Sequence, residues 1–167
     1  MKAAGVLIAI ALALALQTSL ARFVVRGTAA LDLVLVVVVY VALTSGPVTG
    51  MLAGSAAGII QDALSSGTIG IGGLAKAIVG FAVGVIGQQF IVTAAFPRFV
   101  MFFIATLVHA ALFMGLYVAL GLKEFPSPWA AVVSQAVTNS VAGIVAFAVI
   151  ESLPGAMERR RYRRSKR

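Results

Sequence analysis

Two oppositely charged residues stand out within the long apolar stretches of the chain. Asp62 and Lys76 each lie in a long apolar stretch, and each stands at one end of a row of glycines. A carboxylate buried alone must be protonated or must destabilise the fold, whereas a carboxylate beside an ammonium group can keep its charge. The pattern therefore predicts a buried ion pair between Asp62 and Lys76.

The glycines that lead to these two charges recur at every fourth position, which places each row on one ridge of an α-helix. Small residues on such ridges let two helix backbones approach closely. We expect the two segments to pack as an antiparallel hairpin with Gly58 opposite Gly80. Packing of one row against a different protein is the alternative. The glycines of the two rows are Gly46, Gly50, Gly54, Gly58, Gly80 and Gly84.

Three further polar residues fall within apolar stretches near the end of the chain. His109 lies midway along one stretch, and Gln135 and Asn139 lie one helical turn apart on the next. Such residues form either a polar site or proton relay, or hydrogen bonds between helices. We favour hydrogen bonds, because His109 has no carboxylate on its own segment. Asp32 begins an earlier apolar stretch and is expected to cap that helix.

The composition indicates that helices inside a membrane position these residues. The chain has 167 residues, of which 61% are apolar and only 11% are charged, and its mean hydropathy is +1.07. Soluble domains are about 25% charged and about 45–50% apolar. These values exclude a soluble enzyme and a disordered chain, and they indicate an integral membrane protein.

Six apolar segments separated by short polar turns predict an all-α bundle of six transmembrane helices. Pro47, Pro97 and Pro128 each stand where a first helical turn is expected, and proline is tolerated there. We expect one transmembrane domain over residues 1–153, followed by a basic tail over residues 154–167. The predicted helices run approximately over residues 3–21, 29–44, 47–65, 72–93, 97–120 and 128–153.

The basic residues of the tail predict orientation. Seven of the thirteen Lys and Arg residues lie in the last nine positions, so the positive-inside rule favours both termini in the cytoplasm. The tail suits anionic lipid or an acidic cytoplasmic partner, and we expect no nucleic-acid binding. A cleaved signal peptide ending near Ala21 is an alternative interpretation of the first segment. The basic tail residues are Arg159, Arg160, Arg161, Arg163, Arg164, Lys166 and Arg167.

The side chains that carry chemistry are too few for an enzyme. The chain has no cysteine, one histidine and five acidic residues, so a thiolate nucleophile and a multi-histidine metal site are both excluded. Asp62 has only Asp32 as a candidate partner for aspartyl proteolysis, and no serine motif accompanies His109. We predict a protein without catalytic residues, metal or cofactor.

The stretch from Asp32 to Phe81 resembles the MreD family of bacterial rod shape-determining proteins. Members of this family carry a "PD" pair, then glycines at every fourth position that lead to an aspartate, then a glycine-rich turn. The sequence departs from the family at Ala30, where proline is frequent, and Lys76 is not a known family feature. The matching positions are Asp32, Gly46, Pro47, Gly50, Gly54, Gly58, Asp62, Gly67 and Gly70.

The resemblance implies a non-enzymatic scaffold of the cell-elongation complex in the bacterial inner membrane. Its implied partners are MreC and, in a larger assembly, RodA, a penicillin-binding transpeptidase and the filament protein MreB. The implied six-helix fold is similar to the substrate-binding S components of energy-coupling-factor vitamin transporters. A small-molecule-binding transporter subunit is therefore the alternative function, although a shared fold does not transfer an activity.

Overall fold

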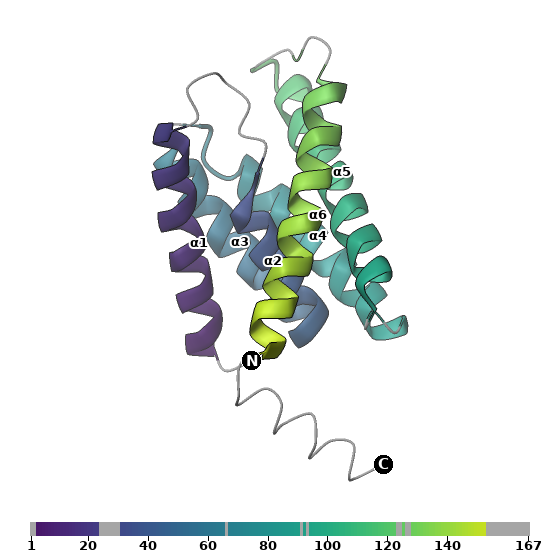
Figure 1. The fold of residues 1–167 in the computed structure, drawn as a ribbon. Helices are drawn as coiled ribbons and strands as arrows, with labels where there is room; N and C mark the ends of the chain where they lie inside the picture. Colours follow the sequence, from purple (N-terminus) through teal and green to yellow (C-terminus); the bar gives the residue numbers. More distant parts are fainter. Residues whose placement is uncertain are drawn as a thin grey trace, which may run out of the picture.

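The computed structural model describes residues 3–23, 31–65, 67–90, 92, 94–122, 125 and 128–152. Within these ranges the chain is helical and contains no strand (Figure 1). The all-α class predicted from the sequence is therefore confirmed for the described residues. The helices are α1 (Ala3–Phe23), α2 (Leu33–Ser45), α3 (Pro47–Leu64), α4 (Ile71–Gln89), α5 (Ala95–Ala119) and α6 (Trp129–Ser152).

Three of these helices combine the length and the hydropathy that a membrane span requires. Among the described helices, α4, α5 and α6 are long and apolar enough to cross a membrane. Helix α2 has only 13 residues, about 20 Å at about 1.5 Å per residue, which is less than a hydrocarbon core of about 30 Å. That all six helices span the membrane, and that the fold is like an S component, stay predictions.

Helix α2 is the centre of the bundle and contacts each of the other five helices. Its side chains are apolar on every face, as is typical of a helix that is surrounded by protein. Asp32 caps its start, because the Asp32 carboxylate accepts a hydrogen bond from the backbone N–H of Leu35. Gly46, at φ +90°, ends α2 and allows α3 to begin directly at Pro47.

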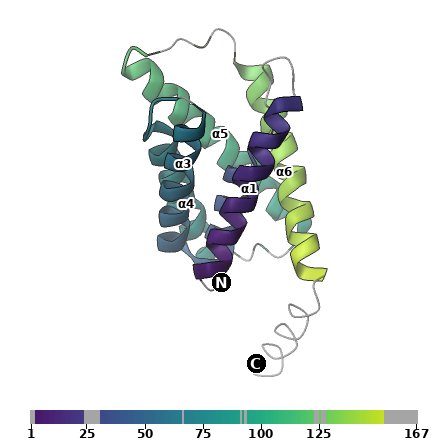
Figure 2. The ribbon, with the colours of Figure 1, turned by 90° about the vertical axis from the view of Figure 1, so that its left-hand side faces the viewer.

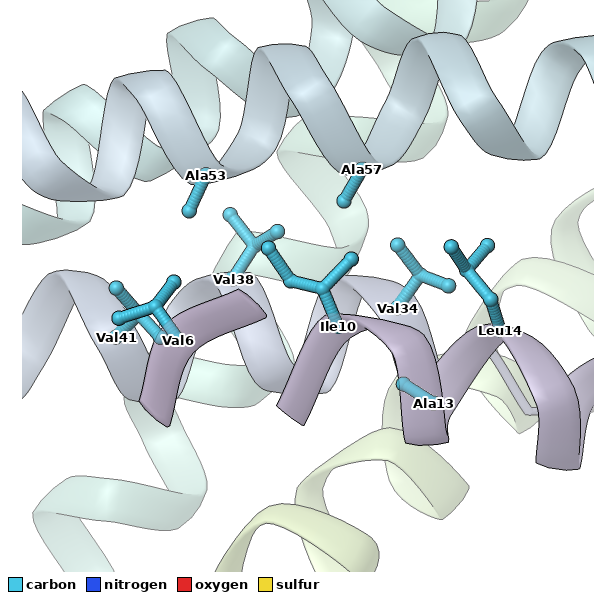
Figure 3. Packing of buried hydrophobic residues seen from close by; sticks show 9 residues of the cluster. All are labelled: Val6, Ile10, Ala13, Leu14, Val34, Val38, Val41, Ala53 and Ala57. Atoms are coloured by element: carbon cyan, nitrogen blue, oxygen red, sulfur yellow. The ribbon is translucent and has the colours of Figure 1, made fainter. Parts of the chain in front are cut away.

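Helix α1 packs on α2 and α3 through one apolar stripe (Figure 3). The stripe residues are spaced three or four positions apart, so they lie on the same face of the helix. They meet valines of α2 and two alanines of α3, Ala53 and Ala57, whose small side chains let α1 approach. The stripe consists of Val6, Ile10, Ala13 and Leu14.

The two glycine rows bring α3 and α4 together along their whole length. A Cβ on Gly50 would lie 2.6 Å from the carbonyl oxygen of Gly80, and a Cβ on Gly54 would collide with the backbone of Lys76. Gly58 faces Gly73 in the same manner. The rows therefore face each other, but Gly80 lies against Gly50 and not against Gly58 as the sequence analysis expected.

Helices α5 and α6 form a second antiparallel pair, which packs against α2 (Figure 2). Phe102 of α5 is almost fully buried and fits against Gly143 of α6, where a Cβ would lie 2.5 Å from the phenylalanine ring. The start of α1 and the end of α6 lie at the same end of the bundle (Figures 1 and 2). The turn between α3 and α4 lies at the opposite end.

Candidate functional site

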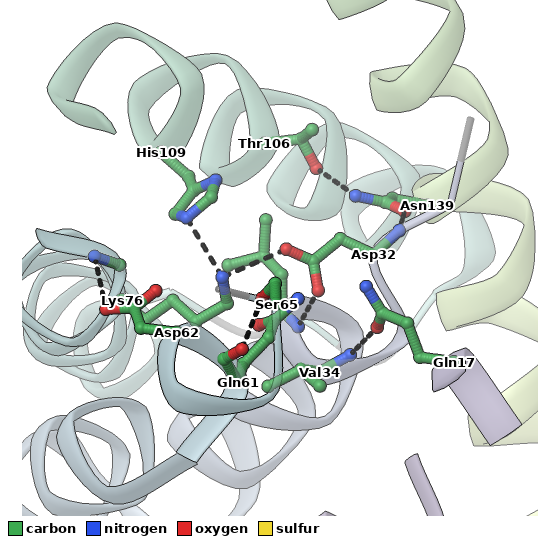
Figure 4. A network of polar contacts seen from close by, with 12 residues as sticks. Gln17, Asp32, Val34, Gln61, Asp62, Ser65, Lys76, Thr106, His109 and Asn139 are labelled. Carbon is green, nitrogen blue, oxygen red and sulfur yellow. Dashed lines mark hydrogen bonds and ion pairs between the residues drawn. The ribbon is translucent and has the colours of Figure 1, made fainter. Parts of the chain in front are cut away.

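A buried ammonium group is the centre of the polar site. The Lys76 Nζ atom lies 3.0 Å from Asp32 Oδ2 and 3.1 Å from His109 Nε2 (Figure 4). The Lys76 and Asp32 side chains are only 4% and 7% exposed, so the ion pair is shielded from solvent. Because a lysine ammonium only donates hydrogen bonds, His109 accepts at Nε2 and is neutral, with its proton on Nδ1.

Asp32 is held in place by α6 as well as by its own helix. The backbone N–H of Asp32 donates to Asn139 Oδ1 at 2.8 Å, and Asn139 Nδ2 donates to Thr106 Oγ1 at 3.1 Å. Asn139 and Thr106 are almost completely buried. The site therefore joins α2, α4, α5 and α6 through one ion pair and several hydrogen bonds. In an apolar interior these polar groups have few alternative partners.

The predicted ion pair between Asp62 and Lys76 is wrong, because the structure gives each residue different partners. The Asp62 Oδ2 atom accepts hydrogen bonds from the backbone N–H groups of Gly70, Gly72 and Gly73, at 2.9, 3.0 and 3.3 Å. These N–H groups are the unpaired donors at the start of α4. A carboxylate is favoured there by the hydrogen bonds and by the helix dipole.

The register of the hairpin explains this error. With Gly50 against Gly80 and Gly58 against Gly73, Asp62 comes opposite the turn before α4 and not opposite Lys76. Lys76 is then one of the residues whose backbone faces Gly54, and its side chain extends toward α2 and α5. The sequence analysis assumed a register with Gly58 opposite Gly80, in which the two charges would have the same depth.

A cavity of about 790 Å³ lies over the ion pair. Its polar wall contains both aspartates, Lys76 and His109, together with serine and glutamine side chains. Its apolar wall comes from α5, from the start of α6 and from Phe125 between them. The wall residues used below are Asp32, Gln61, Asp62, Lys76, His109, Phe113, Met114, Phe125, Ala131 and Gln135.

The three intramembrane polar residues named from the sequence have different surroundings. His109 and Asn139 both belong to the network around Lys76 and Asp32. Gln135 lies one turn before Asn139 on α6 and lines the cavity. Asp32 was expected only as a helix cap, which it is, and its second role as the partner of Lys76 was missed. Only its position at the start of an apolar segment signalled that it is buried.

A second ion pair lies at the other end of the α5–α6 pair. Arg98, in the first turn of α5, donates to Glu151 Oε1 at 2.6 Å, and its guanidinium carbon lies 4.1 Å from the centre of the Phe147 ring. The Glu151 side chain is 32% exposed. The sequence analysis did not predict this pair, because the two residues are far apart in sequence and belong to no common motif.

Some predictions fall on residues that lie outside the described ranges or concern groups that the structure does not hold. The basic tail, including Arg159 and Arg167, lies outside the described residues. Within the described residues, no three His, Cys, Asp or Glu side chains lie close enough to hold a metal ion. The site is therefore a buried hydrogen-bonding network beside a cavity.

The comparisons with known proteins identify one family. A family model described as rod shape-determining protein MreD matches residues 2–153, which is nearly the whole chain. No curated protein and no solved structure matches the chain. Proteins of the matching family are shape-determining membrane proteins and are not known as enzymes. This match, over both glycine rows and all six helices, means that the chain belongs to the MreD family.

Proposed function

We propose that this protein is a non-enzymatic membrane scaffold of the complex that elongates rod-shaped cells, and that it binds MreC. The observation that carries the proposal is the family match over residues 2–153. The partner list implied by the family also contains RodA, a penicillin-binding transpeptidase and MreB. Through these partners the scaffold regulates peptidoglycan synthesis and cell shape.

The buried polar side chains support a scaffold. Asp32, Lys76, His109 and Asn139 hold four helices together and are not arranged around a nucleophile. Breaking such a network destabilises a protein strongly. The network therefore favours the one packing of the four helices in which all of its contacts are made. A rigid bundle is what a partner helix needs for a specific contact inside a bilayer.

The partner contacts a surface other than the glycine rows. Both rows are covered by each other between α3 and α4, so they are closed to an MreC helix. The available surfaces are the exposed apolar faces of α1, α5 and α6 and the faces of α3 and α4 that point away from the glycine rows. One representative residue identifies each face. These residues are Leu12 of α1, Leu52 of α3, Ile78 of α4, Ile104 of α5 and Val141 of α6.

Cross-linking in membranes tests the proposal and finds the contact face. Because the chain has no cysteine, a single cysteine can replace each of these five residues in turn without a background signal. The partner is MreC with one cysteine in its spanning helix. We expect disulfide cross-linking from one face, or from two adjacent faces, and none from the others. Equal cross-linking from all five faces, or none while MreC also fails to co-purify, would contradict the proposal.

The proposed orientation places both termini of the chain on the cytoplasmic side of the bacterial inner membrane. It is supported by the basic tail and by the position of the α1 start and the α6 end at the same end of the bundle (Figure 2). A reporter fused after Arg167 should be active in the cytoplasm, and one inserted at Gly67 should be active outside. A periplasmic signal from the fusion after Arg167 would contradict the orientation.

A further inference from the structure

The cavity above the ion pair has one polar wall and one apolar wall. Lys76, Asp32 and His109 lie on the polar wall, and the side chains of Phe113 and Met114 lie on the apolar wall. Its volume of about 790 Å³ is in the range of about 300–1,000 Å³ that is usual for small-molecule sites. A ligand in this cavity would therefore meet hydrogen-bonding groups on one side and hydrocarbon on the other.

Each charged side chain along the cavity already has partners in the protein. Asp32 and Lys76 neutralise each other at 3.0 Å, and His109 is neutral because it accepts from the ammonium. Asp62 accepts from three backbone N–H groups at the start of α4. Among the described lining residues, no cation is left without a counter-charge. An anionic ligand would therefore have to compete with Asp32 for Lys76. A cationic ligand would have to compete with the N–H groups at the start of α4 for Asp62 and would be repelled by Lys76.

Two hydrogen-bonding positions in the same wall are not filled. The Oε1 atom of Gln61 is buried and has no hydrogen-bond partner among the described residues. The Lys76 ammonium group has three N–H donors, of which Asp32 and His109 accept two. Gln61 and Lys76 both line the cavity, so its wall residues hold one acceptor and one donor without protein partners, and an unpaired buried polar group is costly.

We propose that the cavity binds an uncharged polar group that both donates and accepts hydrogen bonds, as a hydroxyl or an amide does. The group donates to Gln61 Oε1 and accepts from the third N–H of Lys76. The apolar remainder of the ligand lies against Phe113, Met114 and Phe125. This chemistry belongs both to free polyols and sugars and to membrane lipids with uncharged, hydroxylated headgroups. The inference is independent of MreC binding.

Three probes that differ only in their headgroup test the charge preference. Octyl β-glucoside is neutral and hydroxylated, octyl phosphate is anionic, and octyltrimethylammonium is cationic. The full-length protein is held in amphipol, and the probes are added below their micelle-forming concentrations. The signal is the fluorescence of Trp129, which is the only tryptophan and lies between the lining residues Pro128 and Ala130. We expect a saturable change with octyl β-glucoside only.

Free glucose distinguishes the two sources of the ligand. Saturation by glucose at concentrations similar to those of octyl β-glucoside assigns the site to a water-soluble polyol or sugar. Saturation by octyl β-glucoside alone assigns it to a lipid headgroup. Saturation by octyl phosphate or octyltrimethylammonium at equal or lower concentration would overturn the proposal, as would the absence of saturation by all four probes.

Two variants test where the probe binds. Gln61→Leu keeps the volume of the side chain but removes the amide, so we expect about five-fold weaker binding of octyl β-glucoside. The matched control is Gln89→Leu, an exposed residue of α4 outside the cavity, which should bind as the unmodified protein does. Ala131→Phe fills the cavity from an exposed lining position and should abolish saturation without unfolding the bundle. Unchanged binding by Ala131→Phe would overturn the assignment, even if Gln61→Leu did not fold.

Discussion

The two ion pairs of the bundle have similar chemistry but very different surroundings. Lys76 and Asp32 are 4% and 7% exposed, and their contacts reach four helices. The Arg98–Glu151 ion pair joins α5 to α6, and its side chains are 9% and 32% exposed. Water can replace a lost partner at the second pair but not at the first. Burial, more than the distance between the charged atoms, therefore determines how much the loss of one partner lowers the stability of the fold.

Removal of the buried ammonium group should give the largest loss of stability. Lys76→Met leaves the Asp32 carboxylate without a counter-charge, which typically lowers the free energy of unfolding by about 3–5 kcal/mol. The double variant Asp32→Asn/Lys76→Met should recover much of this loss, because no charge is left unpaired. Denaturant unfolding in detergent measures both effects.

The matched control for that double variant is Asp62→Asn/Lys76→Met. Asp62 contacts the start of α4 and not Lys76. The losses in the free energy of unfolding caused by Asp62→Asn and by Lys76→Met should therefore add. Recovery of stability in this control, and none in the variant with Asp32, would mean that the ion pair joins Lys76 to Asp62 after all.

The glycine row that positions Lys76 should be the next most sensitive feature. A Cβ at Gly54 would collide with the carbonyl group of Lys76, so Gly54→Ala must push α3 away from α4. We expect a loss of about 1–3 kcal/mol in the free energy of unfolding, which is typical of overpacking. Gly115→Ala is the control, because nothing lies within 4 Å of its Cβ position. Equal losses for the two variants would argue against close packing of the helices at Gly54.

Asp62 should have a smaller effect than Lys76, although it too is buried. Asp62→Asn removes the charge but keeps an oxygen that can accept from Gly70 and Gly72. We expect a loss of about 1–2 kcal/mol from weaker hydrogen bonds and from the helix dipole. Thermal unfolding in detergent measures it. A loss as large as that of Lys76→Met would contradict the role of Asp62 as a cap.

The Arg98–Glu151 pair, whose carboxylate is partly exposed, should give the smallest effect, and this effect should depend on salt. Arg98→Met should lower the free energy of unfolding by up to about 1 kcal/mol. High salt should reduce the difference between Arg98→Met and the unmodified protein, because salt screens exposed charges, whereas the effect of Lys76→Met should change little. A comparison of denaturant unfolding at low and high salt measures both. If the two variants showed the same salt dependence, the contrast between the pairs would fail.

The helices and their small-residue contacts could be predicted from the sequence because they depend on local patterns. The apolar segments gave the order and approximate bounds of α1 to α6, and the glycine spacing identified the α3–α4 packing. The observed helix ends differ from the predicted bounds where a capping residue sets the end of the helix. Helix α2 begins at Leu33 and not near residue 29, because Asp32 caps it. The Asp32 carboxylate accepts a hydrogen bond from the backbone N–H of Leu35 and so sets the start of the helix.

The partners of the buried charges could not be predicted in the same way. The aspartate that pairs with Lys76 is set by the register of the α3–α4 hairpin and by the position of α2 beside it. Local sequence patterns determine neither of these. The Asp32–Asn139 hydrogen bond joins residues from the second and sixth helices, and only the folded arrangement brings them together. Without an observation of tertiary contacts, Asp62 was the nearer candidate along the chain.

The unequal lengths of the paired helices have a consequence for the surrounding lipid. Helices α3 and α4 have 18 and 19 residues, about 27–29 Å at about 1.5 Å per residue. Helices α5 and α6 have 25 and 24 residues, about 36–38 Å. The α5–α6 pair is thus about 9 Å longer than the α3–α4 pair, a difference that the surrounding bilayer would meet if all of these helices cross it, as the sequence predicts. A bilayer adapts to such a mismatch by thinning beside the short helices or by letting the long ones tilt. This protein would therefore surround itself with a bilayer of two thicknesses, and neighbouring membrane proteins would sort between its two sides by the length of their own helices.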